Sequence, residues 1–104
     1  MSELPKSFVT FREQFPTIAK SYDALGDAAH ASGPLDHKTR ELVKLAIAIG
    51  LRAEGAVHSH TRRAMVAGAS HDEILHVVAL AVTSIGFAPA VAAYTWVSDE
   101  LAPK

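Results

Sequence analysis

Residues 52–63 bring two histidines, one carboxylate and three arginines together near the start of a predicted helix. His58 and His60 are two positions apart, which places them about 200° from each other around a regular helix. The two imidazoles therefore cannot point at one site. Glu54 and His58 are four positions apart and share a face, so only an unwound first turn would let this pair hold a metal ion. While the helix is regular, we expect no metal here.

His60 lies on the side of this helix that carries small residues, among them Ala53, Ala56 and Ala64. A histidine in such a place is either a hydrogen-bonded core residue or a catalyst beside a small pocket, and the spacing leaves both open. The preceding helix carries Glu41 on its early turns. A Glu–His pair is a serviceable proton relay, because imidazole both takes and gives a proton near neutrality. Only two packed antiparallel helices would join Glu41 to His60; otherwise Glu41 forms a solvated salt bridge with a neighbouring basic residue.

Two basic residues lie two and three positions after His60. Arg62 and Arg63 would clamp the carboxylate of a small anionic molecule, or they are exposed charges on the helix surface. The remaining histidines share no common face, and we interpret them as structural or surface residues: His30, His37, His71 and His76.

The composition of the sequence limits which classes of protein and which partners are compatible with it. The chain has 104 residues, 49% hydrophobic and 20% charged, as expected of one globular domain over residues 1–104. A net charge of -1 argues against nucleic acid or anionic lipid as a partner. The sequence has no cysteine, which excludes disulfides, thiolate catalysis, cysteine-bound zinc and iron–sulfur clusters. Residues 1–10 contain no apolar signal core, so we expect a cytoplasmic location.

No segment alternates with period two, so the sequence predicts an all-α fold, a small bundle of about six helices. Asp36 is a predicted N-cap, Gly68 a left-handed residue after a helix, and residues 70–73 a capping box. Pro89 is expected in the first turn of the last helix. The predicted helices span about residues 7–14, 17–31, 36–49, 54–67, 70–85 and 89–101.

Residues 74–97 are nearly all apolar and are long enough to span a bilayer, but residues 86–89 break the run. We therefore expect two buried helices and no membrane segment. Residues 77–82 are consecutive apolar residues and cover every side of the fifth helix, so that helix must be covered all round. A second copy of the chain would supply the cover, which predicts a homo-oligomer. The alternative is that the third and sixth helices cover the fifth.

The motif His60-x-x-x-Ala64-x-x-x-Gly68, followed by the capping box and an apolar helix ending at Gly86, resembles the carboxymuconolactone decarboxylase and alkylhydroperoxidase D superfamily. The resemblance covers about residues 35–101 and includes the run that begins at Glu41. It implies a small all-helical protein of the alkylhydroperoxidase D-like type that assembles into trimers, hexamers or related rings.

The chain departs from both branches of that superfamily. In the peroxidase branch, which is peroxiredoxin-like in activity, Glu41 and His60 match the relay, but the two cysteine positions fall on Ala53 and Ala56. Hydroperoxide reduction needs a thiolate to attack the peroxide and a second thiol to resolve it, and a methyl group does neither. The decarboxylase branch has a glutamate four positions before the histidine, and that position is again Ala56.

Three functions remain as hypotheses. The first is a lyase-like enzyme that decarboxylates or isomerises a small carboxylate or lactone, in which Glu41 and His60 move a proton and His58 or an arginine binds the anion; it requires no cofactor. The second is a non-catalytic oligomer that binds a small ligand or partner. The third, alkyl hydroperoxide reduction, is disfavoured by the missing cysteines.

Overall fold

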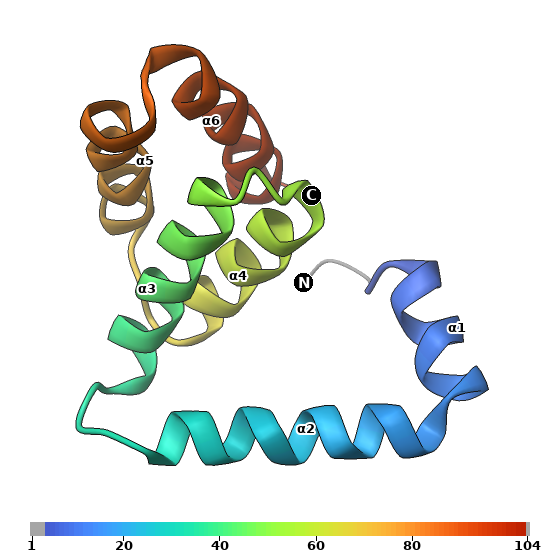
Figure 1. Ribbon diagram of the computed structural model, residues 1–104. Coiled ribbons are helices and arrows are strands. Elements are labelled where there is room, and N and C mark those ends of the chain that lie inside the picture. The colour runs from blue at the N-terminus through green and yellow to red at the C-terminus, as the bar shows by residue number, and fades with distance from the viewer. Residues whose placement is uncertain (1–3, 104) are drawn as a thin grey trace. The chain divides into compact units, whose positions relative to one another are not determined.

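The computed structural model describes residues 4–103, and all regular structure in that range is helical, which confirms the all-α prediction. Figure 1 labels the six helices in chain order. Their bounds are α1 Lys6–Gln14, α2 Pro16–Ala31, α3 His37–Gly50, α4 Glu54–Val66, α5 His71–Ile85 and α6 Phe87–Leu101. No helix among the described residues is both long enough and apolar enough to cross a membrane.

The chain divides into two compact units, one ending at Leu35 and one beginning at Asp36. The first contains α1 and α2, which are joined by a bidentate ion pair between Arg12 and Asp23. Its apolar side chains stay largely exposed, and Ala19 is the one residue of α1 and α2 classed as buried. No feature of the sequence predicts a division after Leu35. The expectation of one domain over residues 1–104 stays a prediction.

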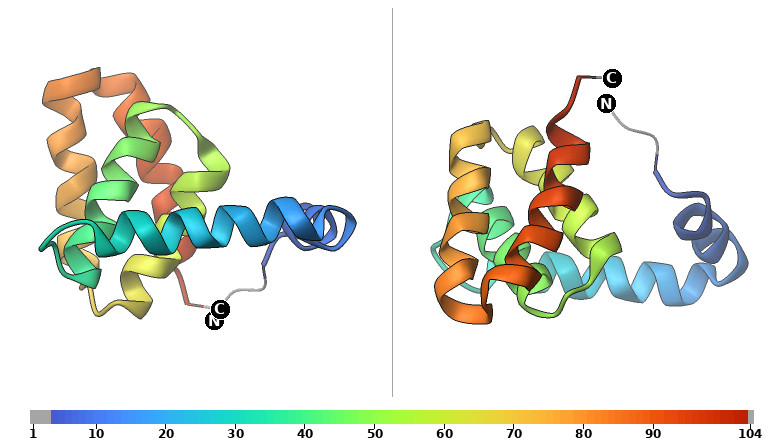
Figure 2. Two further views of the ribbon diagram at one scale, coloured as in Figure 1. Left: turned by 60° about the horizontal axis from the view of Figure 1, so that its bottom comes forward. Right: turned by 90° about the horizontal axis from the view of Figure 1, so that it is seen from above.

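The second unit contains α3 to α6 and holds the hydrophobic core. In it α4 packs against both α3 and α6, and α5 packs against the same two helices from another side (Figures 1 and 2). The largest apolar side chains of the core are fully buried and come from all four helices: Leu45, Ile49, Val57, Ile74 and Val97. Each contributes about 1.5–3 kcal/mol through removal from water, so this core fixes how α3 and α4 face each other.

The predicted caps are present. The carboxylate of Asp36 accepts a hydrogen bond of 2.8 Å from the Thr39 backbone N–H, and this bond is the main cause that lowers the pKa of Asp36. Ser70 and Glu73 form a reciprocal capping box with bonds of 3.0 and 2.9 Å. Gly68 has φ 96°, as expected of the residue that ends α4. The last helix starts two residues before the predicted Pro89, because Gly86, with φ 95°, is its N-cap.

The connection between α3 and α4 ends α3 with an unusual residue. The N–H of Arg52 bonds the carbonyl of Ile49 at 3.0 Å, and the N–H of Ala53 bonds the carbonyl of Ala48 at 3.1 Å. These two bonds form a Schellman motif, whose left-handed position glycine normally occupies. Here it holds Arg52 with φ 55°. The tight turn reverses the chain and makes α3 and α4 antiparallel neighbours.

The helix α5 is only partly covered by the other helices of the second unit. Its buried residues are Ile74 and Val78, while Leu80 and Val82 remain exposed. The alternative to an oligomer was that the third and sixth helices cover the fifth. Both α3 and α6 do pack against α5, but they cover it incompletely. Assembly into a homo-oligomer stays a prediction.

Candidate functional site

The antiparallel pair of α3 and α4 brings Glu41 and His60 together. Glu41 Oε1 lies 2.9 Å from His60 Nδ1. Glu41 is in the second turn of α3, on the side occupied one turn later by the buried Leu45, and His60 is in the middle of α4. The Glu41 side chain is 2% exposed and that of His60 is 16% exposed. The alternative of a solvated salt bridge from Glu41 to Lys38, Arg40 or Lys44 does not describe this carboxylate, because its side chain is buried. Lys38 pairs with Glu73 at 3.0 Å.

This contact fixes the chemistry of the imidazole. When Glu41 is a carboxylate and the ring is neutral, His60 Nδ1 donates the hydrogen bond to Glu41 Oε1 and the lone pair of the ring is on Nε2. A buried carboxylate in this position orients the ring and stabilises the imidazolium that forms when Nε2 takes a proton. The pair therefore has the geometry of an imidazole that is oriented by a buried carboxylate.

Small side chains lie one turn on either side of His60, at Ala56 and Ala64, and two turns before it, at Ala53. Ala64 is fully buried, whereas Ala56 and Ala53 are half-buried. Ala53 is the N-cap residue of α4, with its backbone extended rather than helical. A substrate-binding role for Ala53 and Ala56 stays a prediction.

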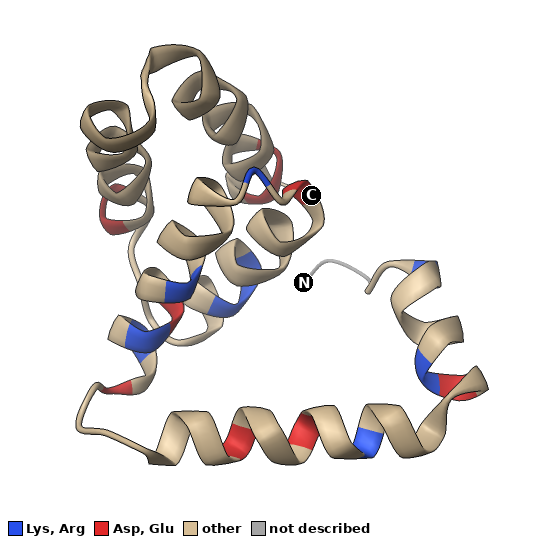
Figure 3. Cartoon of the chain, viewed as in Figure 1, with Lys and Arg blue, Asp and Glu red and all other residues tan. Residues whose placement is uncertain are grey.

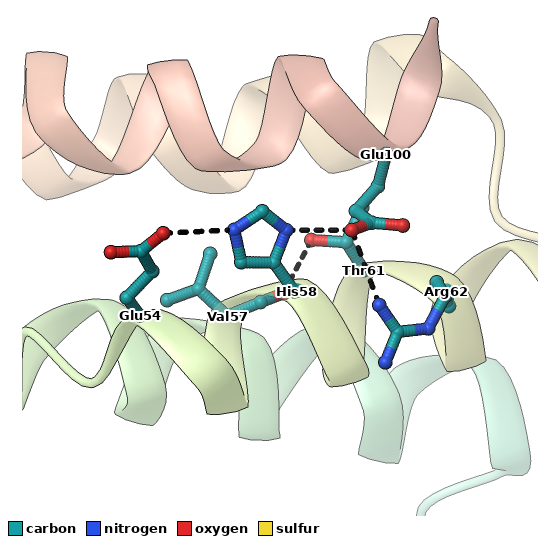
Figure 4. A network of polar contacts seen from close by, with 6 residues as sticks. All are labelled: Glu54, Val57, His58, Thr61, Arg62 and Glu100. Atoms are coloured by element: carbon teal, nitrogen blue, oxygen red, sulfur yellow. Dashed lines mark hydrogen bonds and ion pairs between the residues drawn. The ribbon is translucent and has the colours of Figure 1, made fainter. Parts of the chain in front are cut away.

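His58 belongs to a separate polar network, on the face of α4 turned to α6. Figure 4 shows its imidazole between two carboxylates. Nδ1 lies 2.6 Å from Glu100 Oε2 and Nε2 lies 3.3 Å from Glu54 Oε2. Arg62 Nη1 donates to the same Glu100 oxygen at 3.1 Å. The structure thus separates His58 from the Glu41–His60 pair, as the angle between positions 58 and 60 implies.

Glu100 is the member of this network that sequence reasoning missed. Burial raises its pKa, but the hydrogen bond from His58 and the charge and hydrogen bond of Arg62 together outweigh burial, so the pKa of Glu100 lies below its usual value. It is 42 positions from His58 and follows an acidic neighbour at the end of the last helix. No local pattern connects residues so far apart, and only the packing of α6 on α4 reveals the contact.

The residues predicted to bind a metal ion, and those predicted to bind the substrate, lie in different surroundings. Glu54 and His58 lie on a regular helical turn, and the described residues contain no group of three His, Cys, Asp or Glu side chains arranged around a metal ion. The Arg62 guanidinium is half-buried against Glu100, whereas Arg63 is exposed. Figure 3 shows basic residues along the first half of α3 and the second half of α4. They are Lys38, Arg40, Lys44, Arg62 and Arg63.

The fold and the site define a cysteine-free helical protein with a buried Glu–His pair between two antiparallel helices. The model of the carboxymuconolactone decarboxylase family matches residues 16–99, and the chain belongs to that family. This confirms the resemblance that the motif around His60 indicated.

Two known proteins show how far the similarity extends. An uncharacterized protein of Haemophilus influenzae is 41% identical over 63 residues, which are 61% of this chain and 56% of that protein. The chain thus spans little more than half the length of this curated relative. The crystal structure of an apo carboxymuconolactone decarboxylase family protein from Legionella pneumophila superposes with a TM-score of 0.76 at 26% identity. That similarity covers 90% of this chain and 83% of the other, and it supports the fold.

Proposed function

We propose that the protein carries out acid–base chemistry on a small carboxylate or lactone, with His60 as the base and acid and Glu41 as its supporting group. The observation that carries this proposal is the 2.9 Å contact between the buried carboxylate and His60 Nδ1. It leaves Nε2 as the proton-accepting atom of a ring that is still partly exposed.

One nitrogen suffices for either reaction. In an isomerisation, Nε2 takes a proton from a carbon next to the carbonyl, the electron pair moves into the conjugated system, and the imidazolium returns the proton to another carbon. In a decarboxylation, Nε2 first takes the proton of the substrate's carboxylic acid; the bond to the carboxyl carbon then breaks, carbon dioxide leaves, and the imidazolium returns the proton to the carbon that retains the electron pair. Both steps balance without a cofactor.

An anionic substrate matches the charges around the pair. Five basic residues lie on the halves of α3 and α4 that flank Glu41 and His60. Arg63 is exposed and Arg62 is held by Glu100, so within this proposal Arg63 meets the substrate carboxylate and Arg62 adds its charge from the side. His58 shares the Glu100 carboxylate with Arg62, so within this proposal His58 affects the substrate only through the charges of that network. The protein works as a homo-oligomer, a trimer or hexamer, in the cytoplasm.

A specific observation also favours a second function, binding without catalysis. The two positions that carry the reactive groups of the family, at Ala53 and Ala56, present only methyl groups. In that case the same site holds a small acid or a partner and releases it unchanged. The missing thiols disfavour hydroperoxide reduction in either case.

A ligand screen separates these functions. Small carboxylic acids and lactones are tested for thermal stabilisation of the protein, and each hit is then followed by NMR for product formation. His60→Gln is expected to lower turnover about 10²–10⁴-fold, as loss of a positioned acid–base group does. Glu41→Gln lowers it less, because a Gln oxygen still orients the ring. The exposed His71, changed to Gln, is the matched control.

Each outcome of that screen decides between the alternatives. Turnover that depends on His60 and not on His71 supports the enzyme. Binding without product in every case favours the non-catalytic function. Turnover that survives His60→Gln refutes the assigned roles.

A further inference from the structure

The end of α6 carries negative charge that its own residues do not balance. Asp99 and Glu100 lie in the last turn of this helix, and that turn contains no basic residue. The carbonyl groups at a helix C-terminus carry partial negative charge, so carboxylates are unfavourable there and cations are favourable. The Glu100 side chain is only 8% exposed, so water does little to stabilise its charge. The cations that stabilise it come from another helix.

Two side chains of α4 bring positive charge to Glu100. Arg62 Nη1 donates to Glu100 Oε2 at 3.1 Å, and His58 Nδ1 lies 2.6 Å from the same oxygen. A guanidinium stays charged at every pH at which proteins are normally folded, whereas an imidazole is charged only after it has taken up a proton. The contact between α4 and α6 therefore contains one permanent cation and one cation that depends on the pH.

The second ring nitrogen of His58 also faces a carboxylate. Nε2 lies 3.3 Å from Oε2 of Glu54, in the first turn of α4 (Figure 4). A neutral imidazole has a single N–H, so it donates to one of the two carboxylates and turns a lone pair toward the other. The imidazolium has two N–H groups and donates to both. With the proton on His58, the group of Glu54, His58, Arg62 and Glu100 is electrically neutral; without it, one negative charge is in excess.

Titratable side chains of the helices packed against α4 meet other partners. Glu41 of α3 contacts His60, and Glu73 of α5 pairs with Lys38. In the part of the chain that the structure describes, none of the other titratable or charged residues of α3, α5 and α6 hydrogen-bonds the His58 ring. They are His37, Arg40, Lys44, His71, Asp72, His76, Tyr94 and Asp99. The carboxylates that respond directly to the charge of His58 are therefore those of Glu54 and Glu100.

We propose that His58 is a proton-dependent latch between the start of α4 and the end of α6. Uptake of a proton by the ring gives Glu100 a second cation and gives Glu54 a hydrogen bond, and loss of that proton loosens the last turn of α6. Because the proton adds this attraction only while α6 is in place, the contact strengthens as the pH falls. Glu100 remains a carboxylate in this range, since its pKa lies below the usual value.

The latch is separate from the proposed chemistry. It uses the side of α4 that faces α6, whereas the chemistry uses the Glu41–His60 pair on the side that faces α3. Failure of the latch leaves the acid–base roles untouched, and absence of any turnover leaves the latch untouched.

Hydrogen exchange of the backbone amides of residues 98–101 measures how often the end of α6 opens. Rates are compared at about pH 8 and about pH 5.5, on either side of the ordinary imidazole value of about 6.5, and each rate is divided by the intrinsic rate at that pH. The wild type is expected to be about 10-fold better protected at the lower pH, the effect of changing a neutral hydrogen bond into a charged one. His58→Gln should show the same protection at both. His71→Gln, at the first residue of α5, is the matched control and should keep the increase.

Observation of the ring itself keeps the proposal falsifiable if His58→Gln does not fold. Nitrogen NMR of the isotope-labelled wild type shows whether one or both ring nitrogens of His58 carry a proton. We expect the second N–H to appear over the pH range in which exchange at the end of α6 slows. Glu54→Gln makes the group neutral without that proton, so its increase in protection should be smaller.

Four results would overturn the latch. They are wild-type protection that does not change with pH, an increase that persists in His58→Gln, an increase without the second N–H on the ring, and an equal increase in Glu54→Gln. The first shows that the end of α6 does not respond to protons at all. The others show that a group other than the His58 ring between its two carboxylates causes the response.

Discussion

Replacing Arg52 by glycine should stabilise the protein, although arginine is the natural residue. Arg52 holds φ 55° in the turn between α3 and α4. A left-handed backbone costs an L-residue about 1–2 kcal/mol, and glycine avoids this cost. Glycine in turn loses about 0.5–1 kcal/mol more conformational entropy on folding. The difference predicts a gain of about 0.5–1 kcal/mol for Arg52→Gly, or roughly 2–8 °C in melting temperature.

Two further variants separate the effect of the backbone conformation from the effect of the side chain. Arg52→Ala removes the exposed side chain but keeps a Cβ, so it should gain nothing. Gly68 occupies the equivalent position after α4 with φ 96°, and a Cβ there would meet no atom within 4 Å. Gly68→Ala should therefore lose about 1 kcal/mol for backbone reasons alone. Urea unfolding followed by circular dichroism measures all three. Equal stability of Arg52→Gly and Arg52→Ala would show that the side chain, and not the backbone, sets the effect.

Two other changes test the contacts that hold the helices in place. Glu100→Gln should destabilise the protein by about 1–2 kcal/mol at pH 7 through loss of charged hydrogen bonds. Because the folded-state pKa of Glu100 lies below the ordinary 4.5, the wild type holds this advantage above pH 4.5 and loses it as the pH falls further. Urea unfolding at pH 7 and at pH 3 should show the gap between the two proteins closing, and a constant gap would contradict the linkage. Ser70→Ala removes one half of the capping box and should cost about 1 kcal/mol in the same assay, while Ser70→Asp should restore most of it.

Local chemistry explains why much of the fold was predictable. The caps at Asp36 and Ser70, and the glycine at Gly68, act within four residues of sequence, so their types and spacing suffice to place the helix ends. The start of α6 was predicted two residues late, because the local signal there is ambiguous. Proline fits the first turn of a helix at several positions, and the sequence alone does not show that Gly86 adopts the conformation that begins the helix.

Long-range contacts explain what the sequence did not show. The spacing on α4 separated His58 from His60, and the resemblance singled out Glu41 as a match to the relay of the family. Nothing local pointed to Glu100, because its contact with α4 depends on how α6 packs. The division after Leu35 is equally hidden, since α2 has an ordinary amphipathic pattern whose apolar stripe simply stays exposed.

The helix α4 is thus fixed on two faces by two different carboxylates. His60 meets Glu41 of α3, and His58 meets Glu100 of α6. If the faces are independent, Glu41→Gln should shift the imidazole NMR signals of His60 and leave those of His58 nearly unchanged. Glu100→Gln should do the reverse, because the Glu100 side chain is 8% exposed and hydrogen-bonds His58 and Arg62. A Glu100→Gln variant that moves the His60 signals as far as those of His58 would show that the rotation of α4, and with it the geometry of the relay, depends on α6.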